Sequence, residues 1–197
     1  MKKFNPNHLH KLDSPKRREI LPPDLPVKLF GFEPDSHIVD FGCGSGYFSV
    51  ELAKAIGPNG LLYALDQRIE MLDALTERME SQGLENFRRL QNHEHEIPLG
   101  RSSVHGVFMA TVYHELISPP LILREVTRVL KPGGRLMVID WRPIEEEMGP
   151  ELHHRIAPES VIQAAQEAGL EFCGEIGLHN SFFWLSFVKP DTHLIHE

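Results

Sequence analysis

Short apolar runs alternate along this sequence with longer segments in which apolar residues recur every three or four positions. The runs predict strands, and the longer period predicts helices that pack on them. The predicted strands are, in chain order, residues 37–41, 60–65, 87–91, 106–112, 135–140, 171–176 and 182–188. Seven such strands with five interleaved helices predict an α/β fold built on one doubly wound, mostly parallel sheet.

Glycine or proline marks the ends of several predicted helices. The second helix ends at Gly83, the fourth ends before Gly133, and the last begins at Pro158. Glycine favours the turn after a helix, and proline favours the first helical position. The last two strands have no helical segment between them. They therefore predict a hairpin, which places one antiparallel strand in the sheet.

The first 30 residues differ from the rest of the chain. They are polar, contain five prolines and show no clean period before residue 27. We expect residues 1–30 to form an arm or lid, and residues 31–197 to form one α/β domain. The basic cluster of Lys16, Arg17 and Arg18 is either the solvated face of a helix or a contact for an anionic ligand.

Composition narrows the class of protein. The chain has 197 residues, of which 41% are hydrophobic, enough for the core of one domain. Its net charge of −8 gives no global reason to expect nucleic acid, and the acidic run 145–147 is interpreted as a solvated connection. Two cysteines are too few for a disulfide framework. Without an apolar signal segment or spanning run, we expect a soluble, cytoplasmic protein with no stable membrane insertion.

A glycine loop follows the first strand and carries the main functional signal. It reads Asp40-Phe41-Gly42-Cys43-Gly44-Ser45-Gly46-Tyr47. A dinucleotide fingerprint would need a third glycine at position 47, which is tyrosine, and the phosphate-binding G-x-x-x-x-G-K-[ST] motif is absent. Asp66 ends the next strand, where its carboxylate is placed to accept bonds from both hydroxyls of a ribose. We expect free N–H groups near the loop to face a ligand carboxylate or phosphate.

Three stretches in this order resemble the class I S-adenosylmethionine-dependent methyltransferases, and most closely their small-molecule branch, which includes the ubiquinone/menaquinone C-methyltransferases. The stretches are residues 39–48, 63–66 and 125–136. The resemblance implies a Rossmann-like sheet of order 3-2-1-4-5-7-6 with strand 7 antiparallel. It implies S-adenosyl-L-methionine as the cofactor and makes residues 31–197 the methyltransferase domain.

The resemblance also implies which residues bind this cofactor. Asp40 would neutralise its ammonium, Asp66 would take the ribose, and Ile69 is the preferred residue on an adenine face. His93 or Glu94 lies where relatives read adenine, and the choice between them stays open. The full set of expected cofactor contacts is Asp40, Gly42, Cys43, Gly44, Gly46, Asp66, Gln67, Ile69, His93, Glu94 and Ala110.

The carboxyl end of the fourth strand supplies the candidate catalytic residues, since ligands of open α/β sheets bind at such ends. His114 is suited to proton transfer near neutral pH, Glu115 could orient it, and Tyr113 could line the pocket. Alternatively, His114 packs or caps the next loop. Asp140 and Trp141, at the end of the fifth strand, are further pocket candidates. We expect no metal ligands, because the pairs of nearby histidines give only two ligands each.

Methyl transfer by in-line displacement onto a small, apolar or aromatic molecule is the function that these features favour. The expected partner is therefore a small-molecule methyl acceptor. An alternative from another class is a protein that binds S-adenosylmethionine without catalysis, because the loop and Asp66 are compatible with both. A nicotinamide-dependent oxidoreductase is disfavoured by Tyr47.

Overall fold

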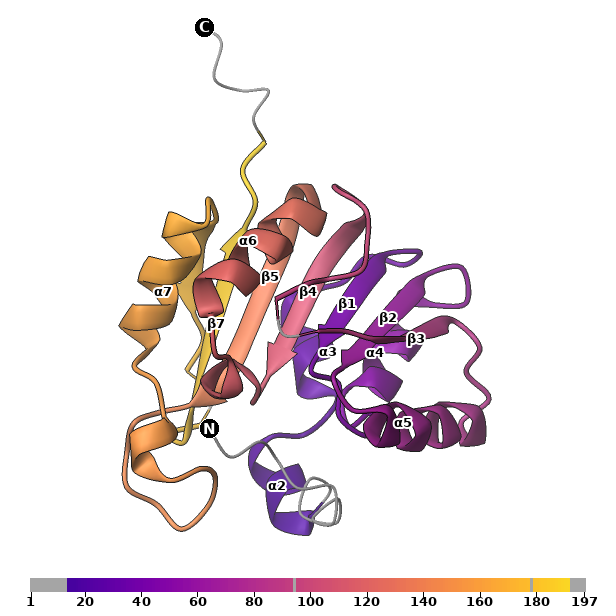
Figure 1. The fold of residues 1–197 in the computed structure, drawn as a ribbon. Helices are drawn as coiled ribbons and strands as arrows, with labels where there is room; N and C mark the ends of the chain where they lie inside the picture. Colours follow the sequence, from indigo (N-terminus) through magenta and orange to yellow (C-terminus); the bar gives the residue numbers. More distant parts are fainter. Residues whose placement is uncertain (1–13, 94, 178, 192–197) are drawn as a thin grey trace, which may run out of the picture. The chain divides into compact units, whose positions relative to one another are not determined.

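The computed structural model describes residues 14–93, 95–177 and 179–191 (Figure 1). It divides into two units, residues 1–92 and residues 93–197. Each unit has its own strands, helices and apolar core.

Unit 1 is a set of three parallel strands with helices between them. β1 pairs with β2, and β2 pairs with β3, both in parallel. α4 and α5 contact each other and β2, and the apolar stripe of each helix is buried. The elements in chain order are α2 (Pro15–Ile20), α3 (Leu25–Phe30), β1 (His37–Phe41), α4 (Ser49–Ile56), β2 (Leu61–Asp66), α5 (Ile69–Ser81) and β3 (Phe87–Gln91).

Unit 2 contains the antiparallel hairpin. β4 and β5 are parallel, whereas β7 runs antiparallel to both β5 and β6. α6 and α7 contact each other, and four fully buried aromatic side chains of β7 fill the core, those of Phe182, Phe183, Trp184 and Phe187. The elements are β4 (Val104–Ala110), η2 (Tyr113–Glu115), α6 (Pro119–Val129), β5 (Leu130–Trp141), η3 (Leu152–His154), α7 (Pro158–Glu167), β6 (Glu171–Glu175) and β7 (Phe182–Val188).

The order of the seven strands confirms the predicted fold class. They hydrogen-bond in the order β3-β2-β1-β4-β5-β7-β6, and the hairpin strand β7 is the antiparallel one. The predicted helix ends are also close, since α5 ends two residues before Gly83 and α7 begins at Pro158.

The expectation of five helices between strands is wrong, because the described residues of the β3–β4 connection form none. Backbone groups of this connection bond to α6 instead. The Ile97 N–H donates to the Glu125 carboxylate at 3.1 Å, and Arg128 donates to the carbonyls of Ile97 and Leu99 at 2.9 and 2.7 Å. The segment is therefore held by an ion pair on α6 rather than by a helical ladder of its own.

The fourth strand ends two residues earlier than predicted, at Ala110. Thr111 still donates its N–H to the Ile139 carbonyl at 2.7 Å, but its φ of 55° turns the chain out of the strand. A β-branched residue rarely adopts a positive φ. This turn leads into η2, where the side chains of Tyr113 and His114 are buried.

The described part of the predicted arm, residues 14–30, packs within unit 1. Leu21 and Phe30 are buried, and the Tyr47 hydroxyl donates to the Leu21 carbonyl at 2.8 Å. Within the basic cluster, Arg17 is buried with its guanidinium 4.5 Å from the centre of the Tyr47 ring, whereas Lys16 and Arg18 are exposed. Residues 1–13 of the arm lie outside the described residues.

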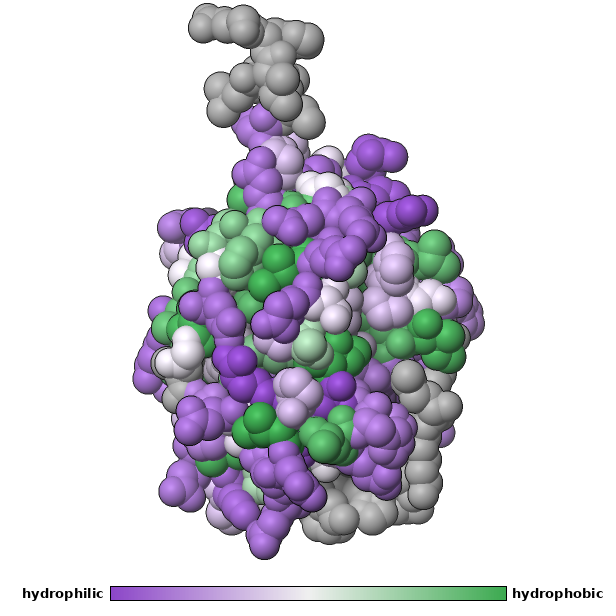
Figure 2. Space-filling view, turned by 90° about the vertical axis from the view of Figure 1, so that its left-hand side faces the viewer, coloured by the Kyte–Doolittle hydropathy of each residue, from purple (hydrophilic) through white to green (hydrophobic). Residues whose placement is uncertain are grey.

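The helices of the described chain are too short or too polar for one of them to cross a bilayer. On the face shown in Figure 2, hydrophobic residues form small groups among hydrophilic ones. In unit 2, four exposed aliphatic residues lie on the segments that follow the carboxyl ends of β4 and β5: Ile117, Leu121, Ile144 and Leu152.

Candidate functional site

Three glycines shape the loop between β1 and α4 in unit 1. Gly42, Gly44 and Gly46 have φ values of 71°, 53° and 81°, a region that other L-residues adopt only with strain. A Cβ atom on Gly46 would also lie 3.3 Å from the Leu75 Cγ of α5. The alternate glycines therefore allow both the sharp turn and the close approach of α5.

Four amides of this loop donate to groups within the protein, so they are not the free N–H groups that the sequence predicts at the helix start beside the loop. Gly42 and Cys43 donate their N–H groups to the Leu65 carbonyl at 2.8 and 2.9 Å, and Gly46 donates to the Cys43 carbonyl at 3.0 Å. Gly44 donates to Asp66 Oδ2 at 3.0 Å. The amides of Gly42, Cys43 and Gly44 fix the loop against the end of β2, and the Gly46 amide closes a turn within the loop. The side chains beside the loop, rather than these four amides, are therefore left to recognise a ligand.

Asp66 is held rigidly at the end of β2. Its Oδ1 accepts the Arg68 N–H at 2.9 Å, while Oδ2 accepts the Gly44 N–H. Burial raises the pKa of the Asp66 carboxyl, although the bonds from Arg68 and Gly44 act to lower it. Each carboxylate oxygen has a second lone pair, so Asp66 can still accept bonds from two ligand hydroxyls.

Asp40 is a deeply buried carboxyl at the end of β1. It is 2% exposed, and Oδ2 accepts a bond from the Ser49 hydroxyl at 2.6 Å. Burial raises the pKa of Asp40 to about 7, helped by the charge of Asp66 and opposed by the Ser49 bond. A nearby ligand cation would favour the ionised form. The residues therefore fit a cofactor that carries an ammonium group and a ribose.

The other residues expected at the cofactor have varied surroundings. Cys43 is buried, and burial raises the pKa of its thiol well above the ordinary value. The Gln67 carbonyl accepts from the Gln91 side chain at 2.9 Å, and Ile69 is 43% exposed at the start of α5. In unit 2, His93 is exposed and Ala110 is 8% exposed at the end of β4. Glu94 lies outside the described residues, and the roles of this group stay predictions.

A buried histidine–aspartate pair lies at the carboxyl ends of β4 and β5. His114 Nδ1 is 2.7 Å from Asp140 Oδ1, and the backbone N–H of His114 donates to Oδ2 at 3.0 Å. The Trp141 N–H also donates to Oδ1, at 2.8 Å. An Nδ1–H bond to a carboxylate leaves Nε2 with the free lone pair of the neutral ring. We call His114 and Asp140 the dyad.

Asp140, rather than Glu115, orients His114. The sequence interpretation gave this role to Glu115, which follows His114 directly. Glu115 Oε1 lies 3.9 Å from Nε2, beyond hydrogen-bond distance and on the other ring nitrogen. Adjacency in the sequence is misleading here, because the η2 turn directs Nδ1 of His114 toward β5.

The charges around the dyad set the protonation of two side chains. Burial lowers the pKa of His114, but the charge and hydrogen bond of Asp140, with the charge of Glu115, outweigh burial and raise it overall, while Arg155 acts to lower it. Burial, with the charge of Asp140, raises the pKa of Tyr113 to about 12. Tyr113 is thus a neutral lining residue at ordinary pH, and His114 is the group that can exchange a proton.

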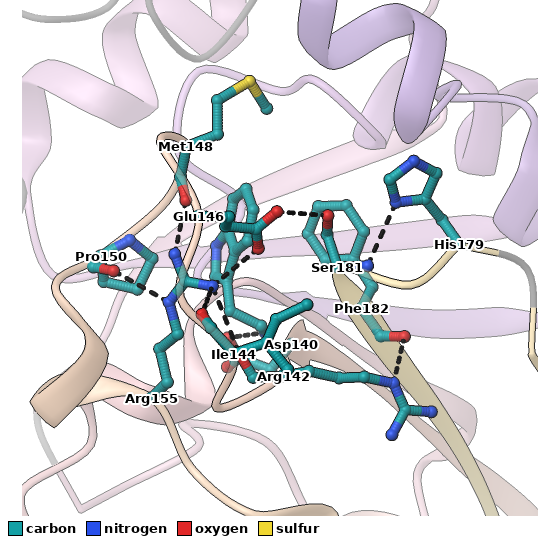
Figure 3. A network of polar contacts seen from close by, with 11 residues as sticks. Asp140, Arg142, Ile144, Glu146, Met148, Pro150, Arg155, His179, Ser181 and Phe182 are labelled. Atoms are coloured by element: carbon teal, nitrogen blue, oxygen red, sulfur yellow. Dashed lines mark hydrogen bonds and ion pairs between the residues drawn. The ribbon is translucent and has the colours of Figure 1, made fainter.

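Arg155 is an unexpected component of this region (Figure 3). Its guanidinium donates to the Glu146 carboxylate at 2.6 Å and to several backbone carbonyls of the segment after β5. The acidic run 145–147 is therefore more than a solvated connection. No motif could have predicted Arg155, because most of its partners are backbone groups; the one available signal was a lone arginine near an acidic run.

Comparison with known proteins agrees with this arrangement. Residues 32–175 match the family described as a methyltransferase domain. The crystal structure of a SAM-dependent methyltransferase from Aquifex aeolicus is 32% identical, with a TM-score of 0.89, and the match covers 95% of this chain and 100% of that one. The [4+2]-cyclase SpnF has a TM-score of 0.75 over 85% of this chain and 79% of its own, and its 16% identity shows a shared fold alone.

A curated relative adds a narrower likeness. The demethylmenaquinone methyltransferase of Bacillus cytotoxicus is 28% identical over 114 residues, which are 58% of this chain and 48% of that protein. The chain thus spans about half the length of the curated relatives it matches. The matched family covers most of the chain, including the glycine loop, Asp66 and the dyad. The chain belongs to the class I S-adenosylmethionine-dependent methyltransferases.

Proposed function

We propose that this protein transfers a methyl group from S-adenosylmethionine to a small, apolar or aromatic acceptor, and that His114 removes a proton from that acceptor. The contact of 2.7 Å between His114 Nδ1 and Asp140 Oδ1 is the observation that carries the proposal. A buried histidine that is held by a carboxylate through one nitrogen keeps the other available for proton transfer.

The residues of unit 1 have the cofactor-binding role in this proposal. Asp40 pairs with the cofactor ammonium, Asp66 accepts the ribose hydroxyls, and Ile69 with Gln67 covers the adenine. When bound, the cofactor supplies a sulfonium methyl group that a nucleophile can displace in line. The loop amides already donate to Leu65 and Asp66, so the loop needs little rearrangement to hold these side chains in place.

The dyad has a defined chemical task. His114 Nε2 accepts the proton that the acceptor loses as it becomes nucleophilic. Asp140 holds the ring in the correct tautomer and stabilises the imidazolium that forms. Tyr113 stays protonated, since its pKa is raised to about 12, so it contributes contacts rather than a base.

The nature of the acceptor is supported by two observations. The relatives at 28% and 31% identity are named for demethylmenaquinone, which supports a quinol or phenol as the acceptor, and a base could remove the hydroxyl proton of such a group. The exposed aliphatic residues on the segments after β4 and β5 favour apolar groups on such an acceptor.

The test is a panel of quinol, phenol, amine and thiol acceptors, with S-adenosylhomocysteine production as the readout. With the best acceptor, we expect His114→Ala to lower kcat by about 10²–10⁴-fold, the range for loss of a general base. Cofactor affinity, measured by calorimetry, should stay unchanged. His153→Ala, which removes an exposed histidine of the same unit, is the matched control and should leave kcat unaltered.

Two results would contradict the proposal. Turnover that survives in His114→Ala would remove the proton-transfer role. Silence with every acceptor, together with tight cofactor binding, would favour a protein that binds S-adenosylmethionine without catalysis. The second outcome is a real alternative, because one fold hosts unrelated activities.

A further inference from the structure

One buried side chain, Arg155, organises the segment after β5 (Figure 3). Its side chain is 2% exposed. Nε donates to the Pro150 carbonyl at 2.9 Å, Nη1 donates to the carbonyls of Ile144 and Arg142 at 2.9 and 3.3 Å, and Nη2 donates to the Met148 carbonyl at 2.5 Å. A single guanidinium therefore gathers the backbone of residues 142–150, which we call the strap.

The strap is also tied to the start of β7. Glu146 accepts from Arg155 through Oε1 at 2.6 Å and from the Ser181 hydroxyl through Oε2 at 2.6 Å. The Arg142 N–H donates to the Ser181 carbonyl at 2.8 Å. These bonds fix the strap to a residue that lies directly before Phe182, the first residue of β7.

The strap lies against the residue next to Asp140. The Arg155 Cζ is 5.3 Å from the centre of the Trp141 ring. Gly149 has a φ of 91°, and a Cβ atom there would lie 2.7 Å from two Trp141 ring carbons. The strap backbone thus packs directly on the indole of Trp141, while the backbone N–H of the same residue donates to Asp140 Oδ1.

We infer that Arg155 is a positioning residue for the dyad: by folding the strap onto Trp141, it fixes the strand end from which Asp140 holds His114. The inference rests on the proposed function of His114. Lysine could not replace Arg155, because an ammonium on a flexible stem cannot bond in fixed geometry to carbonyls and a carboxylate that surround a planar fork.

Arg155 has two other possible roles, which differ in what they predict. In the first, Arg155 only stabilises the fold, and in the second it acts on His114 by charge alone. The described charged groups that influence His114 are Asp140 from β5, Glu115 from η2 and Arg155 itself. A test must therefore separate the geometry of the dyad from the charge near it and from stability.

The experiment uses the full chain without an acceptor and follows the His114 Nδ1 proton by NMR, with His114→Gln to assign the signal. Arg155→Lys keeps the charge and loses the geometry, whereas Arg155→Met loses both. We expect both variants, well below their melting temperatures, to exchange this proton with water about tenfold faster or more, the factor given by the loss of about one hydrogen bond. Arg124→Met is the control, since Arg124 is an exposed arginine on α6 of the same unit, and it should keep the wild-type exchange rate.

Each of two results would overturn the inference. If both Arg155 variants melt earlier but keep the wild-type exchange rate, Arg155 is only a stabiliser. If Arg155→Lys keeps the wild-type exchange rate and only Arg155→Met changes it, Arg155 acts by charge. Should neither variant fold, Ser181→Ala and Glu146→Gln loosen the strap more gently, and unchanged exchange in both would contradict the inference. None of these readouts needs turnover, so they stay separate from a failure of the proposed function.

Discussion

Two buried carboxyl groups at strand ends, Asp40 of β1 and Asp140 of β5, have contrasting partners. Both are nearly inaccessible, at 2% and 1% exposed. Asp40 accepts a bond from a neutral hydroxyl, that of Ser49, and its pKa rises to about 7 because of burial. Asp140 accepts two backbone N–H bonds and faces the ring nitrogen of His114.

The difference lies in where each carboxyl group finds a cationic partner. Asp40 has none among the described groups that bond it and can receive one from a ligand, whereas Asp140 already bonds His114 of the same chain. Burial of a carboxylate is costly unless hydrogen bonds or a cation compensate it. Burial favours the protonated, neutral form of Asp40. When a ligand ammonium binds next to it, the carboxyl can lose this proton and pair with the ammonium instead. Asp140 has hydrogen-bond donors from its own unit, so its partners are set by the fold and not by a ligand.

Asp140→Asn should produce the largest effect, because it removes the built-in partner. An amide at this position can present an N–H group to Nδ1 and favour the wrong tautomer of His114. We expect kcat to fall by about 10³–10⁴-fold, as in other histidine–aspartate pairs, while cofactor affinity measured by calorimetry stays within twofold, or about 0.4 kcal/mol. A large loss of cofactor affinity in this variant would erase the proposed contrast between the two carboxyl groups.

The pH dependence of cofactor binding tests whether Asp40 pairs with the cofactor ammonium, as the comparison with Asp140 proposes. The ammonium pairs with the ionised carboxyl, so affinity should be greatest just above the Asp40 pKa of about 7 and should fall again where the cofactor's own amino group loses its proton, at about pH 8. Below the Asp40 pKa, affinity should fall by about tenfold per pH unit. Calorimetry between pH 5 and 9 (roughly two units on either side) measures this slope, and Asp40→Asn should bind weakly and without it. A flat profile in the unmutated chain would contradict the pairing.

Without ligand, Asp40 should make the stability of the fold depend on pH in the opposite direction from cofactor affinity. The folded pKa of Asp40 lies above the unfolded value, so the folded state holds a proton that the unfolded chain has lost. The free energy of unfolding therefore falls as pH rises from the unfolded value to about 7 and stays low above it. In thermal melts at alkaline pH, Asp40→Asn should accordingly raise the melting temperature, even as it weakens cofactor binding.

Thr111 gives the smallest expected effect and tests how His114 reaches Asp140. Its φ of 55° is strained for a β-branched residue, at a cost on the order of 1 kcal/mol. Asparagine tolerates this region, so Thr111→Asn should stabilise the fold by up to about 1 kcal/mol in denaturant unfolding. Thr111→Val keeps the branch and is the control. If both substitutions give equal stability, the turn is not strained.

The motif of unit 1 could be predicted from the sequence because its parts are close along the chain. Asp40 and the glycines are contiguous, and Asp66 ends the very next strand. What the letters could not show was where the loop amides donate. Three of them bond to the Leu65 carbonyl or the Asp66 side chain, which come within reach only when β2 pairs with β1.

The dyad was predicted in part, since His114 and Asp140 were both candidates but were not paired. They are 26 residues apart, and a turn at Thr111 with an unusual φ decides which carboxylate meets the ring. Arg155 escaped prediction altogether, because its main acceptors are carbonyls that every residue possesses. When a side chain bonds mainly to backbone carbonyls, its partners can be any residue type, so the sequence contains no motif that reveals the contact.

The direction of β7 has a consequence for how this region can vary. A strand that runs against its neighbours brings its beginning to the edge where β5 ends, and the pairing of Trp141 with Phe182 shows this. Ser181 can therefore tether the strap although it follows the strap by a whole helix and a strand. Changes in the turn before β7 would alter the tether while the β5 framework stays intact. The hairpin therefore separates two functions: β5 carries Asp140, and the turn before β7 sets how firmly the strap is held.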